Sequence, residues 1–420
     1  MSTKPKHESL QRTAGVPAAT LLGLGSILGT GVYFAIPDAA IHYQSSMIFP
    51  VLLAAVLATC NALSSAQLAA AFPVSGGTYE YGYQLISPLA GFAAGWMFLC
   101  AKSASAAAAA LESVHYTTGR PALLPAVGLI VVMTILVSSG LRRSTWMNTL
   151  LVAATIIGLL AFAAAAASTK SQPITATSNS QPLTTGQWLQ LTALMFVAFT
   201  GYGRVATLGE EVKNPRRTIP LAVLTTLTIS AVLYIVTAAA VDRLGKSANE
   251  DAVHNLSSLS SGRLRQVVQM GALAAMLGVL LNLVLGLSRV VLAMARRGDL
   301  PHTLSRLNKD HTTPVFAVLT TGGIVCGLTL LGNPRTAWSL SAVTVLIYYG
   351  LTNLAALRLS TEDRLYPRWI SFVGLCGCLL LAAFVEPRSW FTAVVLLAGG
   401  LLLRTLLQKR NHSASETTRE

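Results

Sequence analysis

Two glycine-rich segments lie in the middle of long apolar stretches, where freed backbone and hydroxyl groups could do binding chemistry. The first runs from Gly25 to Gly31 (GSILGTG) and the second from Phe199 to Gly203 (FTGYG). Glycine in a membrane helix often serves only close helix packing. A break in such a helix, however, frees backbone groups where no water is available, and it is tolerated only where it lines a cavity. The two segments therefore predict one binding site built from two interrupted helices.

The backbone groups freed at these breaks indicate the kind of ligand. A half-helix that starts after Gly29 would aim amide N–H groups and a positive dipole end at a carboxylate. Carbonyl groups released from Val197 to Thr200 would accept hydrogen bonds from an ammonium group. A carboxylate site and an ammonium site that face each other describe an α-amino acid.

Three basic residues lie within apolar stretches, Lys102 in the third, Arg204 in the sixth and Arg289 in the eighth, and the last is expected to be structural. A charge at membrane depth is costly and by default indicates function. A lysine in an apolar site can lose its proton, so Lys102 is a candidate to carry a coupling proton. The alternative is a permanently charged lysine that shapes the potential of the cavity. Arg204 either belongs to the site or pairs with carbonyl groups or with Glu210.

The elements that must position these residues are long apolar helices. The chain has 420 residues, 53% hydrophobic and only 11% charged, whereas soluble domains have about 25% charged residues. One spanning helix needs about 20 apolar residues, so the sequence predicts an all-α polytopic membrane protein with about twelve spans. They are expected near residues 14–36, 46–71, 85–114, 122–140, 145–168, 187–209, 219–241, 266–295, 315–332, 336–357, 368–385 and 389–406.

The distribution of basic residues indicates how the chain sits in the membrane. With a cytoplasmic N-terminus, the inner segments hold more than twice as many Lys and Arg residues as the outer ones, and the positive-inside rule then places both termini in the cytoplasm. The net charge of +14 is explained by this orientation, without nucleic acid. The expected surroundings are a lipid bilayer, the cytoplasmic (inner) membrane of a bacterium.

Several kinds of chemistry are excluded by what the sequence lacks. The five cysteines fall inside apolar runs without a CxxC pattern, and no two of the seven histidines have i,i+4 spacing. There is no Walker motif, and no nucleophile with an acid or base partner. We therefore expect no metal, no cofactor, no ATP-driven transport and no enzymatic activity.

Further motifs follow one another in a fixed order along the chain. They are residues 25–32 (GSILGTGV), 72–79 (FPVSGGTY), 95–96 (GW), 199–202 (FTGY), 209–215 (GEEVKNP), 288–290 (SRV) and 293–296 (AMAR). In these motifs the chain resembles the amino acid-polyamine-organocation (APC) superfamily of permeases. The resemblance implies a five-plus-five inverted repeat with helices 1 and 6 broken. It places the first repeat in residues 14–168, the second in 187–357 and two added helices in 368–406, with cytoplasmic segments 1–13 and 407–420.

The resemblance also assigns the binding residues. It gives the substrate carboxylate to backbone amides around three residues, Gly29, Thr30 and Gly31. It gives the ammonium group to carbonyls near Val197 and Thr200. Other residues expected at the site are Phe199 and Tyr202, which would line the cavity, together with Gly201 and Ser26. Arg204 is also expected there, but as a departure from the family pattern, because many relatives carry an acid shortly after the glycine-aromatic pair. The alternative for Ser26 is a hydroxyl bonded to the preceding turn of its own helix. In the loop after the sixth helix, Glu210 or Glu211 is expected to pair with cationic residues of another cytoplasmic loop and to hold a gate.

The chain departs from the family pattern where the coupling ion would act. Proton-coupled relatives carry a lysine in helix 5 at the position that is Thr155 in this chain. Two outcomes are open: Thr155, Ser288 and helix-1 carbonyls coordinate sodium, or the site stays vacant and transport depends on protons or on exchange. Two hydroxyls are few for sodium, so we favour the second outcome, with Lys102 as the titrating group.

The function that the resemblance implies is secondary amino acid transport by alternating access. Neutral amino acids are the first expectation, because a backbone clamp with apolar walls suits them. Acidic amino acids are the alternative, because Lys102 and Arg204 would make the cavity positive. A sensor that binds amino acids on the same fold without transport is a third reading.

Overall fold

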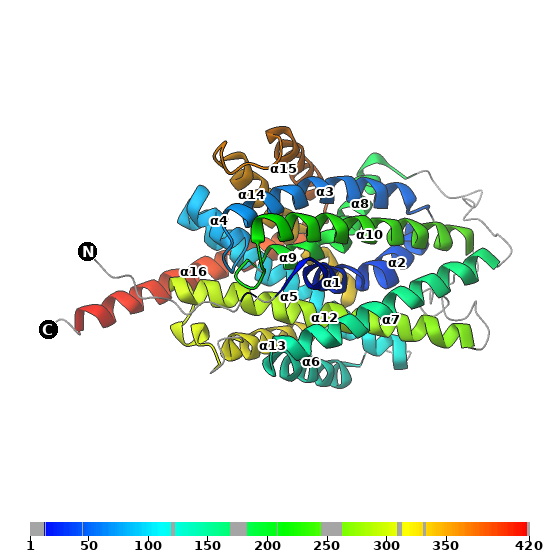
Figure 1. Cartoon of the computed structure of the whole chain (residues 1–420), viewed down its shortest axis with the longest axis horizontal. Helices are drawn as coiled ribbons and strands as arrows, with labels where there is room; N and C mark the ends of the chain where they lie inside the picture. Colours follow the sequence, from blue (N-terminus) through cyan, green and yellow to red (C-terminus); the bar gives the residue numbers. More distant parts are fainter. Residues whose placement is uncertain are drawn as a thin grey trace.

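Long apolar helices that run along one common axis make up the computed structural model of the chain (Figure 1). The structure describes residues 12, 14–43, 45–118, 122–168, 183–207, 209–244, 263–308, 313–330 and 333–417. Apart from residue 12, the predicted segment 1–13 lies outside the described residues, as do positions 418–420 of the predicted tail.

Eight helical stretches among the described residues are long and apolar enough to cross a membrane. The first, Val16–Ala40, contains α1 (Val16–Ile27), the π-helix η1 (Gly31–Ala35) and most of α2 (Ile36–Tyr43). The other seven belong to α3 (Ile48–Ala71), α5 (Pro88–Thr118), α7 (Leu141–Ser168), α10 (Pro215–Leu244), α12 (Arg263–Arg297), α14 (Pro334–Leu357) and α16 (Pro387–Thr417). The prediction of an all-helical, multi-pass membrane protein is confirmed.

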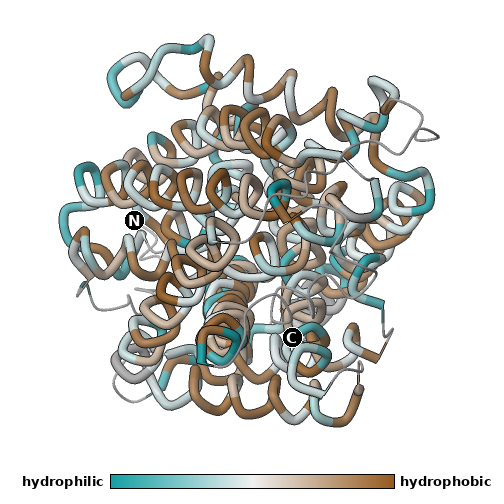
Figure 2. Tube along the Cα trace, turned by 90° about the vertical axis from the view of Figure 1, so that its right-hand side faces the viewer, coloured by the Kyte–Doolittle hydropathy of each residue, from teal (hydrophilic) through white to brown (hydrophobic). Residues whose placement is uncertain are grey.

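Shorter helices complete the bundle. Three of them are apolar, namely α6 (Leu123–Ser138), α13 (Val315–Thr329) and α15 (Arg368–Ala383). The remaining elements are α4 (Thr78–Leu85), α8 (Thr185–Phe199), the 3₁₀ turn η2 (Thr200–Tyr202), α9 (Gly203–Ala206) and the 3₁₀ turn η4 (His302–Ser305). Seen along the bundle axis, apolar segments are spread around the outer rim (Figure 2).

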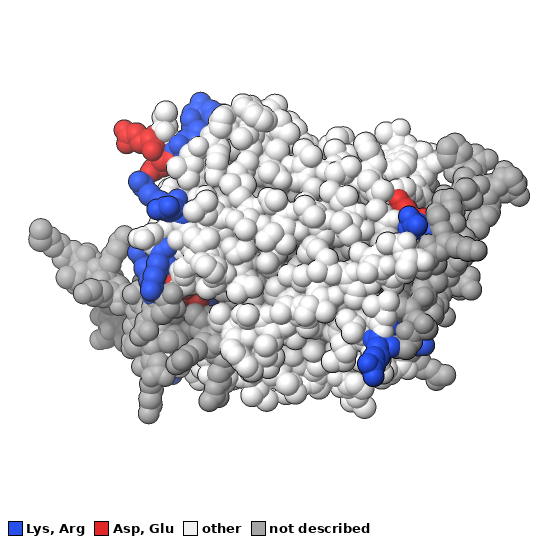
Figure 3. All heavy atoms as spheres, turned by 45° about the vertical axis from the view of Figure 1, so that its right-hand side comes forward, with Lys and Arg blue, Asp and Glu red and all other residues white. Residues whose placement is uncertain are grey.

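The outer surface has the character of a membrane protein. Large apolar side chains such as Leu124, Ile135 and Phe391 are 86%, 61% and 73% exposed, as expected where lipid rather than water surrounds the helices. On the face shown in Figure 3, the described Lys, Arg, Asp and Glu residues gather near the two ends of the molecule. The band between these ends is free of them and fits the hydrocarbon core of a bilayer.

Glycine contacts bring the central helices close together. A Cβ atom added at Gly158 of α7 would lie 2.6 Å from the Cα of Gly271 on α12. Farther along the same two helices, Asn282 donates a hydrogen bond to Asn148, whose own amide donates to the carbonyl of Leu21 in α1 at 2.8 Å. These contacts align α7 and α12 in antiparallel register and attach α1 to both.

Backbone and ionic contacts show which parts of the chain share one end of the bundle. Ala14 forms a parallel bridge with Val212 in the loop after α9. At the C-terminal end of α12, Asp299 accepts a hydrogen bond from Arg404 of α16 at 2.9 Å. Because Glu210 of the same loop pairs with Arg296 of α12, the start of α1 and the last turns of α16 lie at the same end.

Candidate functional site

Both glycine-rich segments interrupt their helices. Helix α1 ends at Ile27, and Leu28 leaves the helical conformation with φ −72° and ψ 92°. A wider π-helical turn then starts at Gly31. Helix α8 ends at Phe199 and continues as the 3₁₀ turn η2 and the single turn α9.

The two breaks lie directly against each other. A Cβ atom at Gly201 would lie 2.3 Å from the carbonyl oxygen of Ser26, and one at Gly31 would lie 2.4 Å from the Cβ of Ala198. The hydroxyl of Tyr234 on α10 lies 2.6 Å from the carbonyl oxygen of Ile27 and 3.1 Å from that of Ala198. One phenol therefore reaches the last turn of both interrupted helices.

A small cavity of about 20 Å³ lies between the breaks. A cavity of this volume holds a water molecule but no amino acid. Its lining contains seven residues that the sequence predicted, namely Ser26, Thr30, Gly31, Lys102, Val197, Thr200 and Gly201. The other lining residues come from the same elements or from α12 and α14, and they are Ile27, Ser105, Ala198, Val279, Leu283 and Trp338.

Six other predicted site residues do not line this cavity, and three of them, Gly29, Phe199 and Tyr202, belong to the interrupted segments. A Cβ atom at Gly29 would lie 2.1 Å from Cγ2 of Val279, so this glycine serves contact with α12. The ring of Phe199 packs against Tyr234 with centroids 4.8 Å apart. The ring of Tyr202 packs against Tyr349 of α14 at 5.2 Å. Both aromatic rings therefore pack against neighbouring helices rather than line the cavity.

Lys102 is the cation at the cavity. Its Nζ atom donates to the hydroxyl of Thr200 at 2.7 Å and lies 3.5 Å from the carbonyl oxygen of the same residue. The residue is 4% exposed, and within the described part of the chain it has no carboxylate at ion-pair distance. Its partners are neutral oxygens at the C-terminal end of α8.

The hydroxyl of Ser26 donates to the carbonyl of Leu22 at 2.8 Å. This is the bond to the preceding turn that the sequence left open as an alternative, and the residue still reaches the cavity.

Arg204 is buried to 4% exposure but lies outside the cavity lining. Its Nη1 donates to the hydroxyl of Thr207 at 3.1 Å, while Nε and Nη2 have no hydrogen-bond partner among the described residues. The side chain packs on α12, where a Cβ atom at Gly286 would lie 3.1 Å from its Cδ.

The structure does not bring Thr155 and Ser288 together. In the register set by Gly158 and Gly271, Thr155 lies opposite a residue near position 274 of α12. Ser288 is then about 20 Å farther along the helix, at 1.5 Å per residue. Each hydroxyl donates within its own helix, Thr155 to Leu151 at 2.7 Å and Ser288 to Leu285 at 2.8 Å.

Glu210 and Glu211 are paired at the end of the bundle that holds the start of α1 and the last turns of α16. Glu211 binds Arg289 at 2.7 Å, and Glu210 binds Arg296 at 3.0 Å. The predicted pairing of these glutamates with cations is thereby confirmed, although both partners lie on α12 rather than in a loop. The two ion pairs join the loop after α9 to that helix.

A second cluster at this end centres on Asp299. Its carboxylate accepts hydrogen bonds from the hydroxyls of Tyr79 and Tyr83 at 2.8 and 2.5 Å and from Arg404 at 2.9 Å. Burial, and then the neighbouring carboxylate, raise the pKa of both phenols, so they remain protonated donors. The cluster joins α4, α12 and α16.

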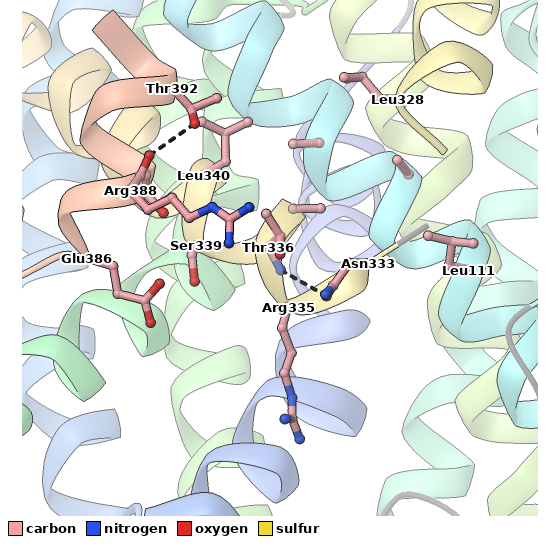
Figure 4. A pocket seen from close by; sticks show the side chains of 14 residues that line it. Leu111, Leu328, Asn333, Arg335, Thr336, Ser339, Leu340, Glu386, Arg388 and Thr392 are labelled. Carbon is pink, nitrogen blue, oxygen red and sulfur yellow. Dashed lines mark hydrogen bonds between the residues drawn. The ribbon is translucent and has the colours of Figure 1, made fainter. Parts of the chain in front are cut away.

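A larger cavity of about 560 Å³ lies at the opposite end, between α5, α13, α14 and α16 (Figure 4). Its walls include Ala104, Ala107 and Leu111 of α5. Charged side chains, among them Glu386 and Arg388, also line it (Figure 4).

The side chains that could bind a metal ion are scattered. In the described ranges, no three His, Cys, Asp or Glu side chains lie close enough to hold one.

Comparison with known proteins gives the family. A family model described as amino acid permease matches residues 18–411. An uncharacterized transporter of Mycobacterium tuberculosis (strain ATCC 25618 / H37Rv) is 39% identical over 388 residues, covering 91% of this chain and 88% of the relative. The branched-chain amino acid permease of Bacillus subtilis (strain 168) is 27% identical over 448 residues, covering 97% and 95%.

The methylthioribose transporter of the same Bacillus strain is 25% identical over 448 residues, covering 98% of this chain and 96% of the relative. The long match, the helical bundle and the two interrupted helices agree with one another. The chain therefore belongs to the amino acid permease family of the APC superfamily, a family of transporters and not of enzymes.

Proposed function

We propose that this protein carries amino acids across the cytoplasmic (inner) membrane of a bacterium by alternating access. The observation that supports this most directly is the meeting of two interrupted helices at one small cavity. The amide groups after Gly29 suit a carboxylate, and the carbonyl end of α8 suits an ammonium group. The cavity is too small for an amino acid, so the helices must separate before one binds.

We propose twelve membrane spans arranged as two inverted repeats of five helices, followed by two more. Eight long and three shorter apolar helices occupy eleven of the predicted positions, and α8 with η2 and α9 occupies the sixth. The repeats then comprise residues 14–168 and 187–357, with the added helices at 368–406. We place the segments 1–13 and 407–420 in the cytoplasm. The shared end of α1 and α16 supports one common side of the membrane, and the excess of Lys and Arg in the inner segments supports the cytoplasm as that side.

The substrates that we propose are neutral amino acids. Apolar side chains such as Ile27, Val279 and Leu283 dominate the cavity wall, and one curated relative is named for branched-chain amino acids. Acidic amino acids are the alternative class, since Lys102 would attract a second carboxylate. The same charge disfavours cationic amino acids.

We propose protons or exchange, rather than sodium, as the source of coupling. Thr155 and Ser288 lie too far apart for their hydroxyls to coordinate one sodium ion, whereas Lys102 lines the cavity. A lysine side chain can lose its proton in apolar surroundings and regain it on exposure to water.

The experiment that tests the proposal has two stages. Purified protein is heated in the presence of each amino acid, and of methylthioribose because of the named relative, and the shift of the unfolding temperature identifies ligands. Labelled hits are then used for counterflow in proteoliposomes. We expect counterflow of a neutral amino acid without sodium. Stabilisation without counterflow would show a sensor, and no response to any amino acid would refute the proposed function.

A further inference from the structure

The ammonium group of Lys102 lies where a substrate's ammonium group would bind. It contacts both oxygens of Thr200, at 2.7 and 3.5 Å, and Thr200 is the residue at which α8 gives way to the 3₁₀ turn. The C-terminal end of a helix carries a partial negative charge that attracts cations. A residue of α5 thus already occupies the position that the proposed function gives to the substrate.

The remaining acceptors at this point are in use. The carbonyl of Val197 accepts from the backbone N–H of Thr200 and, at 2.7 Å, from its hydroxyl. The carbonyl of Thr200 accepts from the hydroxyl of Tyr349 at 3.0 Å. At Val197 and Thr200, a second ammonium group would therefore compete for oxygens that already accept hydrogen bonds, unless Lys102 leaves.

Among the described residues, no negative charge near the cavity would balance a second cation. The lining residues from α1, η1, α8 and α12 are uncharged. The phenols of Tyr202, Tyr348 and Tyr349 pack behind the break and are neutral at physiological pH. On α5 itself the carboxylate of Glu112 is ten residues away, about 15 Å along the helix. The cation in the adjoining turn, Arg204, adds positive charge.

We propose that Lys102 is a tethered competitor for the ammonium site, which an amino acid displaces only when Lys102 releases its proton. The inference rests on the proposed function and adds a direction to it. Two cations at one uncompensated, buried site repel each other strongly. A neutral lysine amine has no such conflict with the substrate's ammonium group.

The proton balance of the cycle follows from this competition. On the side where the amino acid enters, one N–H bond of the Lys102 ammonium breaks, the proton passes to water, and the substrate's ammonium donates to Thr200. On the other side the amino acid leaves, and Lys102 takes one proton from the solution there before the empty site returns. Each zwitterion that crosses is exchanged for one proton moving the opposite way, so one positive charge crosses per cycle. A proton gradient directed into the cell would thus drive export.

Binding at different pH values tests the competition. The probes are L-leucine and 4-methylpentanoate, which is leucine without its amino group; for another neutral amino acid from the panel, its own des-amino analogue is used. We expect leucine affinity to rise up to about tenfold per pH unit while Lys102 is protonated, because binding releases one proton. The des-amino analogue leaves Lys102 in place, so its affinity should not rise with pH.

Three variants separate this effect from general changes in the site. Lys102→Met should bind leucine with an affinity independent of pH. Lys102→Arg keeps its charge at every accessible pH and should lose leucine binding while the analogue still binds. Lys213→Met removes an exposed lysine far from the cavity and should keep the pH profile of the parent protein.

A transport assay tests whether the proton and the amino acid move in opposite directions. In proteoliposomes loaded with labelled leucine, acid on the opposite side of the membrane should accelerate efflux, and Lys102→Met should abolish this acceleration. Leucine affinity that falls or stays constant as pH rises, or acceleration by acid on the leucine side, would overturn the inference while leaving amino acid transport intact. Failure of every amino acid to bind at any pH would overturn the proposed function and this inference together.

Discussion

Arg289 on α12 and Glu211 in the loop after α9 form an ion pair in which the Nε and Oε1 atoms are 2.7 Å apart and the side chains are 0% and 1% exposed. A buried pair of this kind contributes little net stability, but the removal of one partner leaves an uncompensated charge. We expect Arg289→Met to lower the free energy of unfolding by about 3–5 kcal/mol. The double variant Arg289→Met/Glu211→Leu should recover most of that loss. The measurement is thermal or denaturant unfolding in detergent.

An exposed ion pair provides the control for this experiment. Arg216 and Asp363 pair at 3.1 Å with side chains 75% and 38% exposed, so Arg216→Met should cost less than about 1 kcal/mol. Equal losses from Arg289→Met and Arg216→Met would mean that burial does not decide the cost of breaking these pairs.

The second prediction concerns Gly31, where the two breaks touch. Gly31→Val should abolish transport and binding while the protein still inserts and folds, because its Cβ would press on Ala198 at 2.4 Å and block the backbone amides. Gly128→Val is the matched control, since a Cβ there meets no described atom within 4 Å. Parental uptake of labelled substrate by the Gly31→Val protein would mean that the site lies elsewhere.

The third prediction concerns the phenol that touches both interrupted helices. Tyr234→Phe removes a hydroxyl that lies 2.6 Å from the Ile27 carbonyl and leaves that buried oxygen without this donor. Such a loss costs about 1–3 kcal/mol, and we expect it in the unfolding free energy together with a lower transport rate. Tyr366→Phe, in the loop before α15, is the control. If both variants behave like the parent, the hydroxyl of Tyr234 does not hold the breaks together.

The fourth prediction is that Arg204→Met leaves stability unchanged or raises it. Two guanidinium nitrogens of Arg204 are buried without hydrogen-bond partners in the described structure, and an apolar side chain of similar length avoids that cost. If Arg204 serves substrate selection, affinity for acidic amino acids should fall in the same variant. Competition assays with acidic, neutral and basic amino acids measure this. A loss of 3–5 kcal/mol, as for Arg289→Met, would instead make Arg204 a structural residue.

Prediction from the sequence succeeded where glycine and apolarity set the structure locally. The segments GSILGTG and FTGYG are the places where α1 and α8 end, and charged residues mark most helix ends within a few positions. The last helix is an exception, because α16 continues to Thr417, well past the predicted end at 406. Charges stop a span at the membrane surface, but they do not stop a helix.

Contacts between distant residues could not be predicted in the same way. Lys102 and Thr200 were both expected at the site, yet their hydrogen bond depends on which face of α5 meets α8, and a chain with few polar residues gives little sign of that. The 3₁₀ turn after Phe199 advances by about 120° per residue instead of 100°, so residues that follow it point away from the directions a regular helix would give. Tyr202 was expected at the cavity from the family resemblance and Arg204 from its charge at membrane depth, and neither lines the cavity.

The contact between Gly158 and Gly271 constrains how this protein can evolve. Each position excludes a side chain because of the other's backbone, with a Cβ atom 2.6 Å from the opposite Cα in one direction and 2.5 Å in the other. Changing one glycine does not make room for changing the second, so no order of single substitutions leads to a different pair at this helix spacing. The residues at this contact between α7 and α12 can change only after the two helices have moved apart. Homologues with a side chain at either position should therefore show a wider α7–α12 separation.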